Sequence, residues 1–274
     1  MDNQTNNIIK NESQIFEFNK VSFLYSRQKE AIINSSFKVK QGDFLGVIGP
    51  NGSGKSTLLK LAAGIICPDK GKILYRNQSI KNYKKIEFAK LVAWIPQESG
   101  IVFPFKTQEV VLMGRYPYKS GFSFETPEDI KICSQAMEVT GTKFLFDKNF
   151  NEISGGEKQR VLIASALAQK PETLILDEPI SFLDIKYQIE ILEILRTLNE
   201  KNFVTIIIAL HDLNLASKYC SLLLLLKEGK IINKGLPNII LEKTNVESVY
   251  ETKIKTLLDA EDSSLVILPR TRNN

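Results

Sequence analysis

The stretch Gly49-Pro-Asn-Gly-Ser-Gly-Lys-Ser56 decides the fold of this 274-residue chain. Its spacing, Gly-x4-Gly-Lys-Ser, matches the whole pattern of a phosphate-binding loop (P-loop). The apolar run Phe44-Leu-Gly-Val-Ile48 precedes it and a helix-like segment, 56–64, follows it, so the loop joins a strand to a helix. Glycines let backbone N–H groups turn toward phosphate oxygens, and the helix N-terminus adds a favourable dipole. We therefore expect Lys55 to reach the terminal phosphates of a nucleotide and the Ser56 hydroxyl to bind Mg²⁺.

Short apolar runs recur along the chain and alternate with helix-like segments. They are mostly continuous and rich in Ile, Val and Leu, which is typical of strands buried on both faces of a parallel sheet. We expect strands at 44–48, 91–95, 173–177, 204–209 and 222–226, and helices at 56–64, 157–169 and 185–200. This alternation predicts an α/β fold whose ligands bind outside the carboxyl ends of the strands.

Two regions depart from this alternation. Residues 15–45 alternate apolar and polar positions, as in Ile15-Phe-Glu-Phe18, which predicts antiparallel strands. Residues 98–153 are interrupted by Pro and Gly and read as helices and loops. We interpret them as a helical insertion between two halves of the α/β core. The stretch 246–274 shows little beyond a short strand at 265–268.

Composition limits the class of protein. A hydrophobic content of 43% and a charged content of 24% are those of a globular domain, and a net charge of +5 is typical of a solvated surface. Cys67, Cys133 and Cys220 lie far apart, which argues against a disulfide framework or a zinc site and indicates a reducing compartment. The apolar runs are much shorter than the ~20 residues of a membrane helix, and the N-terminus does not resemble a signal peptide. We expect a cytoplasmic chain whose membrane function comes from a partner.

Two carboxylates, Asp177 and Glu178, end the apolar run that begins at Thr173. A carboxylate at the tip of a parallel strand can reach the Mg²⁺ shell, so Asp177 is the expected Walker B residue. Glu178 lies one position further, where it could polarise an attacking water. Adjacent acids could instead cap the next helix, but the P-loop in the same chain favours the nucleotide interpretation.

Single polar residues follow two other expected strands. His211, the one histidine of the chain, comes directly after the run 204–210, at the ligand-binding edge of the sheet. A lone histidine is more often a surface or packing residue, yet this position directs its hydrogen-bonding capacity toward a γ-phosphate. Gln97 follows Trp94-Ile-Pro96, where its amide oxygen could reach Mg²⁺ or the attacking water.

A second phosphate-binding device is suggested by Ile153-Ser-Gly-Gly-Glu-Lys-Gln-Arg160. Ser154 and Glu157 form a capping box, a common helix start. A capping box does not require Gly155 and Gly156, each of which costs up to ~1 kcal/mol relative to alanine in a helix. We therefore expect something to approach the backbone closely here. Without a lysine, this helix start could complete a phosphate site built elsewhere but would be a poor site alone.

Together these motifs resemble the ATP-binding cassette (ABC) ATPases, over about residues 15–245. The signature motif of that family usually begins with Leu, for which this chain has Ile153. The Q-loop of the family matches Gln97, its D-loop matches Ser181-Phe-Leu-Asp184 and its switch histidine matches His211. Its aromatic adenine platform matches Tyr25, with Phe23 as an alternative.

The resemblance implies a P-loop NTPase (RecA-like) core with an N-terminal antiparallel β-subdomain and an inserted helical subdomain. The expected units are 1–96 plus 154–245 as the ATP-binding core, 97–153 as the helical signature subdomain and 246–274 as an extension without an assigned role. ATP and Mg²⁺ are the implied cofactors, with Glu178, His211 and Gln97 as catalytic residues and Ser56, Gln97 and Asp177 around the metal. The implied nucleotide contacts are Tyr25, Gly49, Pro50, Asn51, Gly52, Ser53, Gly54, Lys55, Ser56, Thr57, Ser154, Gly155, Gly156, Glu157 and Asp184.

The resemblance also accounts for the second device. In this family two cassettes pair head to tail, and each ATP lies between the P-loop of one subunit and the signature motif of the other. Ser154 and Gly156 are thus expected to contact a γ-phosphate that Lys55 of a second copy holds. ATP would close the dimer, and hydrolysis with Glu178 as general base would reopen it.

A finer resemblance points to importers of iron-siderophore, haem and cobalamin type. It rests on Gly114-Arg-Tyr-Pro117, His211-Asp-Leu-Asn-Leu-Ala216 and Asp184-Ile-Lys-Tyr-Gln188, and the first of these favours the iron-chelate branches. It implies a peripheral location at the cytoplasmic face of the inner membrane, bound to transmembrane permease subunits and acting indirectly with a substrate-binding protein, without nucleic acid. The alternative is an export or non-transport ABC ATPase that acts as an ATP-driven dimerisation switch. A P-loop kinase or GTPase would leave 154–160 unexplained.

Overall fold

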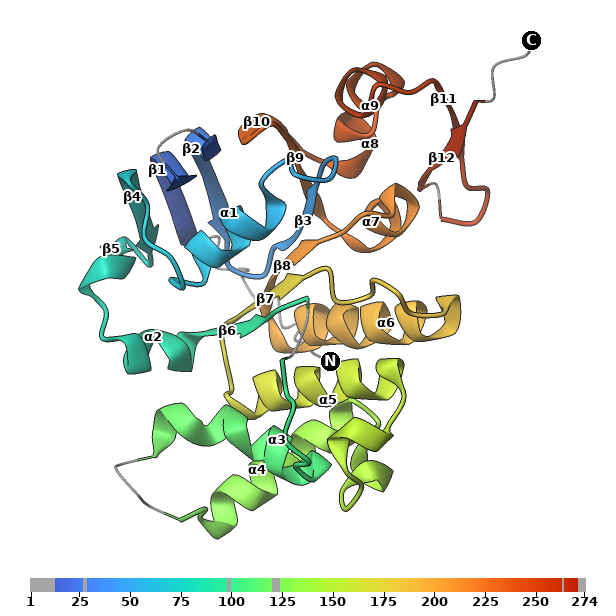
Figure 1. Ribbon diagram of the computed structural model, residues 1–274. Helices are drawn as coiled ribbons and strands as arrows, with labels where there is room; N and C mark the ends of the chain where they lie inside the picture. The colour runs from blue at the N-terminus through green and yellow to red at the C-terminus, as the bar shows by residue number, and fades with distance from the viewer. Residues whose placement is uncertain (1–12, 27–28, 98–99, 120–123, 263, 271–274) are drawn as a thin grey trace, which may run out of the picture.

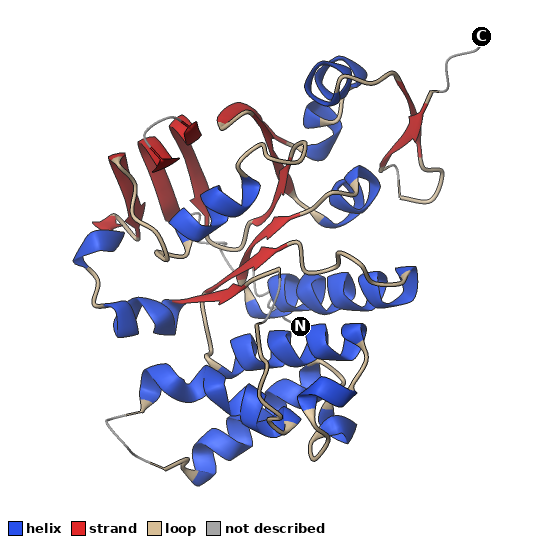
Figure 2. Ribbon diagram, viewed as in Figure 1, coloured by secondary structure: helices blue, strands red, loops and turns tan. Residues whose placement is uncertain are grey.

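The computed structural model describes residues 13–26, 29–97, 100–119, 124–262 and 264–270. Figure 1 shows a central twisted sheet with a helical part below it. The N-terminal strands form an antiparallel sheet at the upper left, and a C-terminal hairpin lies at the upper right. Figure 2 shows that the strands lie together with helices in the upper half of this view, whereas the lower part consists of helices and loops.

The central sheet has six strands, of which five are parallel and one edge strand is antiparallel. In sheet order they are β10 (Lys230–Gly235), β9 (Leu222–Lys227), β3 (Phe44–Ile48), β8 (Thr205–Ala209), β7 (Thr173–Asp177) and β6 (Val92–Ile95). Every residue of β3, β7 and β8 is buried. The prediction that these continuous apolar runs form strands buried on both faces is therefore confirmed for the three strands.

Alternate side chains of these strands enter two separate cores. Leu45 and Val47 of β3 pack with helix α1 (Lys55–Ala62) and the antiparallel sheet on one face. Phe44 and Ile48 pack on the opposite face. That face is covered by α5 (Gly155–Ala168), α6 (Ile185–Asn202), α7 (Leu213–Tyr219), α8 (Pro237–Ile240) and α9 (Lys243–Tyr250). Because successive side chains of a strand point to opposite faces of the sheet, the residues of β3 are shared between the two cores.

The N-terminal sheet is antiparallel and four-stranded, in the order β2-β1-β4-β5. Its strands are β1 (Gln14–Ser26), β2 (Lys29–Lys40), β4 (Lys70–Tyr75) and β5 (Gln78–Ser79). Phe16, Phe18 and Tyr75 are buried beneath it, and Phe16 contacts Tyr75 edge to face with ring centroids 4.9 Å apart. The short helices η1 (Ile80–Asn82) and α2 (Lys85–Leu91) lead from this sheet to β6.

Between β6 and β7 the chain forms the helical part. It contains α3 (Thr107–Leu112), η2 (Met113–Tyr118), α4 (Pro127–Val139), η3 (Lys143–Leu145), η4 (Phe150–Glu152) and the start of α5. These elements enclose a third core around Val111, Met137 and Phe150. Because α5 contributes side chains both to this core and to the sheet core, it ties the helical part to the sheet.

A buried ion pair explains the Gly114-Arg-Tyr-Pro117 element within the helical part. The Arg115 guanidinium donates to Asp129 of α4 at 2.8 Å and to the Ala168 carbonyl at the end of α5 at 2.7 Å. A Cβ on Gly114 would lie 1.9 Å from the Ser165 carbonyl oxygen of α5, so only glycine allows this approach. This element therefore fastens η2 to α4 and α5.

The C-terminal segment is part of the fold rather than an appendage. Val246 and Val249 of α9, together with Ile254, belong to the core on the α6 face of the sheet. The hairpin of β11 (Ile254–Leu258) and β12 (Leu265–Pro269) then reaches α7, where the Ile267 N–H donates to the Asn214 side chain at 2.7 Å. Helix α9 begins at Lys243, so it crosses the division expected at 246, and the three-part division itself stays a prediction.

The α/β class with an antiparallel subdomain and a helical insertion is confirmed, as are the expected strands to within a residue or two and the strand at 265–268. The strands β4, β5, β10 and β11 and the helices α2, α7, α8 and α9 were not predicted from the sequence. Strands β4 and β10 are partly exposed and carry lysines, so neither shows a continuous apolar run. Helix α7 has only seven residues, too few for a clear helical period.

Candidate nucleotide-binding site

The glycine-rich turn between β3 and α1 forms the floor of the site. Gly54 is the N-cap of α1 with φ of 106°, and a Cβ there would lie 2.6 Å from the Ala31 carbonyl oxygen. Gly49 has φ of 153°, and a Cβ there would lie 2.2 Å from the Leu226 carbonyl oxygen. Both positions thus require glycine, because the neighbouring backbone and the torsion leave no room for a side chain. The turn places the N-terminus of α1 at the carboxyl edge of the sheet.

Lys55 is buried within this turn and folds back onto it. Its Nζ donates to the carbonyl oxygens of Gly49 at 3.0 Å and Pro50 at 3.3 Å. Burial lowers the pKa of Lys55, and the nearby carboxylates Glu178 and Asp177 oppose that fall. The nearby carboxylates therefore do not fully offset the cost of burying the Lys55 ammonium, which leaves it suited to bind a strongly anionic ligand.

Ser56 and Asp177 come together next to Lys55. The Ser56 hydroxyl donates to Asp177 Oδ1 at 2.9 Å, and Asp177 is the last residue of β7. Burial raises the pKa of Asp177, and the hydrogen bond from Ser56 counteracts this. A carboxylate beside a hydroxyl is the hard-oxygen donor set that Mg²⁺ takes together with phosphate oxygens. In the described ranges no cluster of three His, Cys, Asp or Glu side chains could hold a metal ion by itself.

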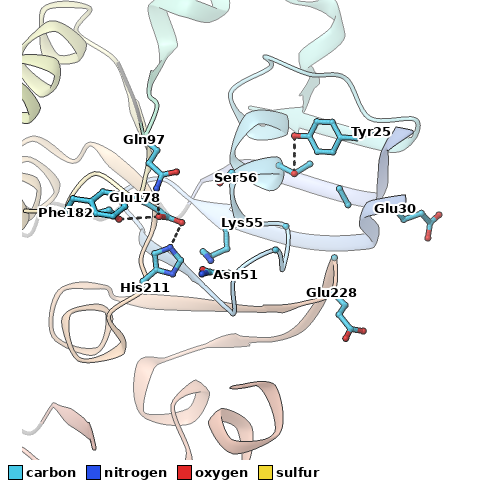
Figure 3. Close-up of a pocket in the computed structure, with 16 residues that line it drawn as sticks. Tyr25, Glu30, Asn51, Lys55, Ser56, Gln97, Glu178, Phe182, His211 and Glu228 are labelled. Carbon is cyan, nitrogen blue, oxygen red and sulfur yellow. Dashed lines mark hydrogen bonds and ion pairs between the residues drawn. The ribbon is translucent and has the colours of Figure 1, made fainter. Parts of the chain in front are cut away.

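Three polar side chains contact the Glu178 carboxylate. The carboxylate accepts from Gln97 Nε2 at 2.9 Å and from Ser181 Oγ at 3.3 Å, and it contacts His211 Nε2 at 2.5 Å. Gln97 follows β6, Glu178 follows β7 and His211 follows β8, so three adjacent strand ends bring them together (Figure 3). The Glu178 backbone has φ of 51°, an uncommon conformation for a residue with a side chain, which turns the carboxylate toward the cavity.

An aromatic side chain lies at the far end of the site. Tyr25 is 60% exposed, and its hydroxyl shares a 3.3 Å hydrogen bond with Thr57 Oγ1 of α1. Phe23, its alternative as the adenine platform, packs into the core beneath the antiparallel sheet. The two rings meet edge to face, with centroids 5.0 Å apart. Tyr25 therefore offers the free ring face.

These groups line one cavity of about 1010 Å³. Its wall is formed by the P-loop, Tyr25, Gln97, Glu178 and His211, as Figure 3 shows. Ser181 and Phe182, expected only as part of the D-loop, also line it, and four further lining residues were not predicted from the sequence: Glu30, Ala31, Glu228 and Gly229. Of these, Glu228 and Gly229 form the turn after β9, and the rule that ligands bind beyond the carboxyl ends of parallel strands could have identified them.

The signature stretch lies outside this cavity. Ser154, Gly155, Gly156 and Glu157 are absent from its lining, as is Asp184. The predicted capping box is present: Glu157 accepts from the Ser154 N–H and hydroxyl, both at 2.8 Å, and these hydrogen bonds lower the pKa of Glu157. The helix start therefore faces a surface that this chain alone leaves open.

The two glycines of the signature stretch differ. A Cβ on Gly156 would lie 2.6 Å from Cγ of Tyr187 in α6, so this glycine is required by packing within the chain. A Cβ on Gly155 would meet only Leu183 Cδ2, at an ordinary 3.5 Å. The expected close approach to the backbone is thus made at Gly156 by Tyr187 of the same chain. The expected contact of Gly156 with the γ-phosphate held by a second copy stays a prediction. Within the described part of the chain, no contact requires a glycine at position 155.

The helix after His211 is capped and anchored. Asp212 accepts hydrogen bonds from the N–H groups of Asn214 at 2.8 Å and Leu215 at 3.0 Å, so it is the N-cap of α7. From the hairpin, the Leu265 N–H donates to Ser217 of α7 at 3.0 Å. The loop that carries His211 is therefore held between β8 and a fixed helix.

Residues 32–181 match the family model described as ABC transporter. The chain is 39% identical over 243 residues to the petrobactin import ATP-binding protein FpuC of Bacillus anthracis, covering 89% of each chain. It is 35% identical over 239 residues to the ferric enterobactin transport ATP-binding protein FepC of Escherichia coli, covering 87% of this chain and 88% of FepC.

The chain is also 33% identical over 231 residues to the cobalamin import ATP-binding protein BtuD of Halobacterium salinarum. That match covers 84% of this chain but 58% of BtuD, and a Bacillus subtilis relative is spanned over only 52% of its length. The chain thus spans little more than half the length of the first curated relatives that it matches.

Solved structures agree in fold. An inward-facing metal-chelate type ABC transporter superposes with a TM-score of 0.83 at 27% identity, covering 94% of this chain and 98% of that one. A dimeric bacterial ABC transporter cassette superposes with a TM-score of 0.73 at 25% identity, covering 81% and 99% respectively.

Proposed function

This chain belongs to the ABC transporter family, and from that premise we propose that it is the ATP-hydrolysing subunit of an importer for an iron chelate. The observation that carries the proposal is the grouping of Gln97, Glu178 and His211 beside the P-loop. There a carboxylate, an amide and an imidazole lie next to Lys55 and the Ser56–Asp177 pair, the groups that binding of a nucleoside triphosphate requires.

Nucleotide binding follows from the charges of the floor. The backbone N–H groups of Gly52 to Thr57 and the N-terminus of α1 would cradle the phosphates, while Lys55 would leave the Gly49 and Pro50 carbonyls for phosphate oxygens. Tyr25 would stack on the adenine. Bound Mg²⁺, held by Ser56, Asp177 and the Gln97 amide oxygen, would supply neutralising charge to the phosphates.

Hydrolysis is assigned to Glu178 as general base. Its side chain is only 10% exposed, and the hydrogen bonds from Gln97 and Ser181, together with the contact to His211, orient it toward the cavity. With a γ-phosphate in place, Glu178 would take a proton from the attacking water and His211 would hold the phosphate oxygens by hydrogen bonding. Gln97 would place the water. Lys55→Ala should abolish nucleotide binding; unchanged affinity would refute the assignment of the loop.

A second copy completes the site in this proposal. Ser154 and Gly155 are exposed at the start of α5, outside the cavity and without an in-chain ligand. In a head-to-tail dimer they would present the hydroxyl and bare N–H groups to the γ-phosphate held by Lys55 of the other copy. The dimeric cassette among the similar structures supports such pairing.

Docking to a permease is assigned to the helical part. Exposed apolar side chains flank α3 and belong to η2, among them Val102, Phe103, Met113 and Tyr116. Met113 and Tyr116 also line a cavity of about 800 Å³. Exposed clusters of this kind mark protein interfaces. Within the described ranges no helix has both the length and the apolar character to cross a membrane. We therefore propose that the chain binds permease subunits at the inner face of the cell membrane, and that a binding protein delivers the substrate to them.

The iron-chelate assignment rests on the names of FpuC and FepC rather than on a contact in this chain, because Gly114 and Arg115 serve packing in the helical part. The test is uptake of labelled ferric siderophore, haem and cobalamin by cells lacking the gene, with wild-type and Glu178→Gln genes returned. Loss of ferric siderophore or haem uptake, restored only by the wild type, is expected. Loss of cobalamin uptake alone would overturn the substrate class, and unchanged uptake of all three would overturn the import function.

A further inference from the structure

The C-terminal segment reaches the P-loop from behind. Tyr250 ends α9, and its ring packs against the core on the α6 face of the sheet. Its hydroxyl is buried and makes no hydrogen bond within the described ranges. Burial raises the pKa of Tyr250 to about 12, and the adjacent Gly49 N–H opposes this rise. Tyr250 lines one small cavity together with residues 50–53, so its side chain lies next to the P-loop.

Other groups tie this end of α9 to the same loop. Lys227, at the end of β9, donates to the Ser248 carbonyl at 2.9 Å and to Glu251 at 2.7 Å. Two residues further on, the Gly229 N–H donates to the Ser53 carbonyl of the P-loop at 2.9 Å. The end of α9 is thus linked through the β9–β10 turn to the far end of the loop.

Between these ties lies a cavity of about 220 Å³, bounded by the outer face of residues 50–53, by Lys227 and Glu228 and by residues 249–251. The Ser53 hydroxyl is also buried without a partner, and it would lie 2.8 Å from a Cβ placed on Gly49. Two buried hydroxyls therefore flank Gly49, where a purely structural packing would favour apolar side chains.

We propose that Tyr250 is a positioning residue of the nucleotide site, through which the C-terminal segment holds the Gly49 peptide and the P-loop in the shape that receives phosphates. In the present conformation Lys55 supports the Gly49 and Pro50 carbonyls from inside the loop. When Lys55 turns to a phosphate, that support is lost, and the contact from Tyr250 remains. This inference rests on the proposed nucleotide binding at the loop.

The experiment compares Tyr250→Phe with Tyr219→Phe in the full chain. Tyr219 is a matched control, because it also ends a helix, is buried, has a pKa raised to about 12, and donates to Glu193 at 2.9 Å away from the P-loop. Measurements are the Kd of ATP without hydrolysis, KM and kcat of ATP hydrolysis, and the thermal midpoint.

Tyr250→Phe should raise the ATP Kd and KM about fivefold, the effect of one ordinary hydrogen bond that the hydroxyl would accept from the Gly49 N–H once Lys55 has turned to a phosphate. The kcat and the thermal midpoint should stay close to those of the wild type. Tyr219→Phe should lower the thermal midpoint and leave Kd and KM unchanged. A Tyr250→Phe protein that is less stable but binds ATP as the wild type does would overturn the positioning role.

A second variant keeps the test open if Tyr250→Phe does not fold. Lys227→Met removes the ties to Ser248 and Glu251 at a side chain that is 26% exposed, and it should raise the ATP Kd in the same direction. An unchanged Kd would overturn the inference. If the wild-type chain itself bound no ATP, the proposed function would fail, and that result is distinct from either outcome.

Discussion

Replacing the two signature glycines one at a time separates packing within the chain from contact with a second copy. An alanine Cβ at position 156 would lie 2.6 Å from Cγ, 2.9 Å from Cδ1 and 3.0 Å from Cβ of Tyr187. Tyr187 lies in the first turn of α6, so either the ring or the start of α5 must shift. At position 155 the same Cβ makes an ordinary 3.5 Å contact with Leu183.

The expected magnitudes follow from these distances. Forcing a methyl group into a packed interface costs roughly 1–3 kcal/mol, and the better helix propensity of alanine returns roughly 0.5–1 kcal/mol. From the middle of each range, Gly156→Ala should destabilise the fold by about 1 kcal/mol, which for a chain of this size lowers the thermal midpoint by roughly 2–4 °C. Gly155→Ala should leave stability unchanged or slightly higher.

Function should respond in the opposite way. The Gly155→Ala methyl group would occupy the space between the start of α5 and the phosphate of a second copy, so ATP-driven association and hydrolysis should fall while each chain still binds ATP. The assays are thermal unfolding by circular dichroism, ATP binding, and sedimentation with and without ATP.

A double variant supplies the control. Adding Tyr187→Ala to Gly156→Ala should restore part of the lost stability, with a coupling of about 0.5–3 kcal/mol in the double-mutant cycle. A Gly156→Ala protein as stable as the wild type would refute the packing argument. A Gly155→Ala protein that associates and hydrolyses normally would refute the argument for a partner.

Three further changes test other parts of the account. Glu178→Gln should abolish hydrolysis yet keep ATP binding and leave an ATP-bound dimer on a sizing column; normal turnover would exclude Glu178 as the base. The Arg115 guanidinium holds the pKa of Asp129 at about 2, below its ordinary value of 3.8, so this pair contributes roughly 2 kcal/mol above pH 4 that is lost as the pH falls from about 4 to 2. The free energy of unfolding, measured with urea between pH 4 and pH 2, should fall by this amount more in the wild type than in Asp129→Asn. The same dependence on pH in both proteins would contradict the assignment. Phe182 is 97% exposed with φ of 64°, so Phe182→Gly should stabilise the isolated chain by about 0.5–1 kcal/mol; a lower urea midpoint would contradict this.

The sequence predicted the parts of the site that follow strand ends. Asp177 ends a buried apolar run, His211 follows another, and Lys55 follows the glycine-rich turn after a third. Because parallel strands carry their carboxyl ends to one edge, this local pattern was sufficient. Gln97 was found in the same way. The sheet, the helical insertion and the capping box at Ser154 were predictable because each depends on neighbouring residues.

The remaining features depend on contacts between distant residues. Nothing near Gly156 indicates that Tyr187 of another helix lies on it. Likewise, the proximity of Tyr250 to Gly49 arises only when α9 packs on the far side of the sheet. Such contacts have no local period or spacing, so they become visible only in three dimensions.

The most direct measurement of the central claim, that the nucleotide site is shared between two copies, is a mixing experiment in the Glu178→Gln background. One chain carries Ser154→Arg, the other carries Lys55→Ala, and ATP-dependent association is followed by sedimentation. Each chain alone should remain monomeric with ATP, because every pairing of identical chains lacks one half of both sites. An equimolar mixture should form a dimer with one intact site. If the mixture stays monomeric while the unaltered Glu178→Gln chain dimerises, or if either chain dimerises alone as well as the unaltered one, the shared site is contradicted.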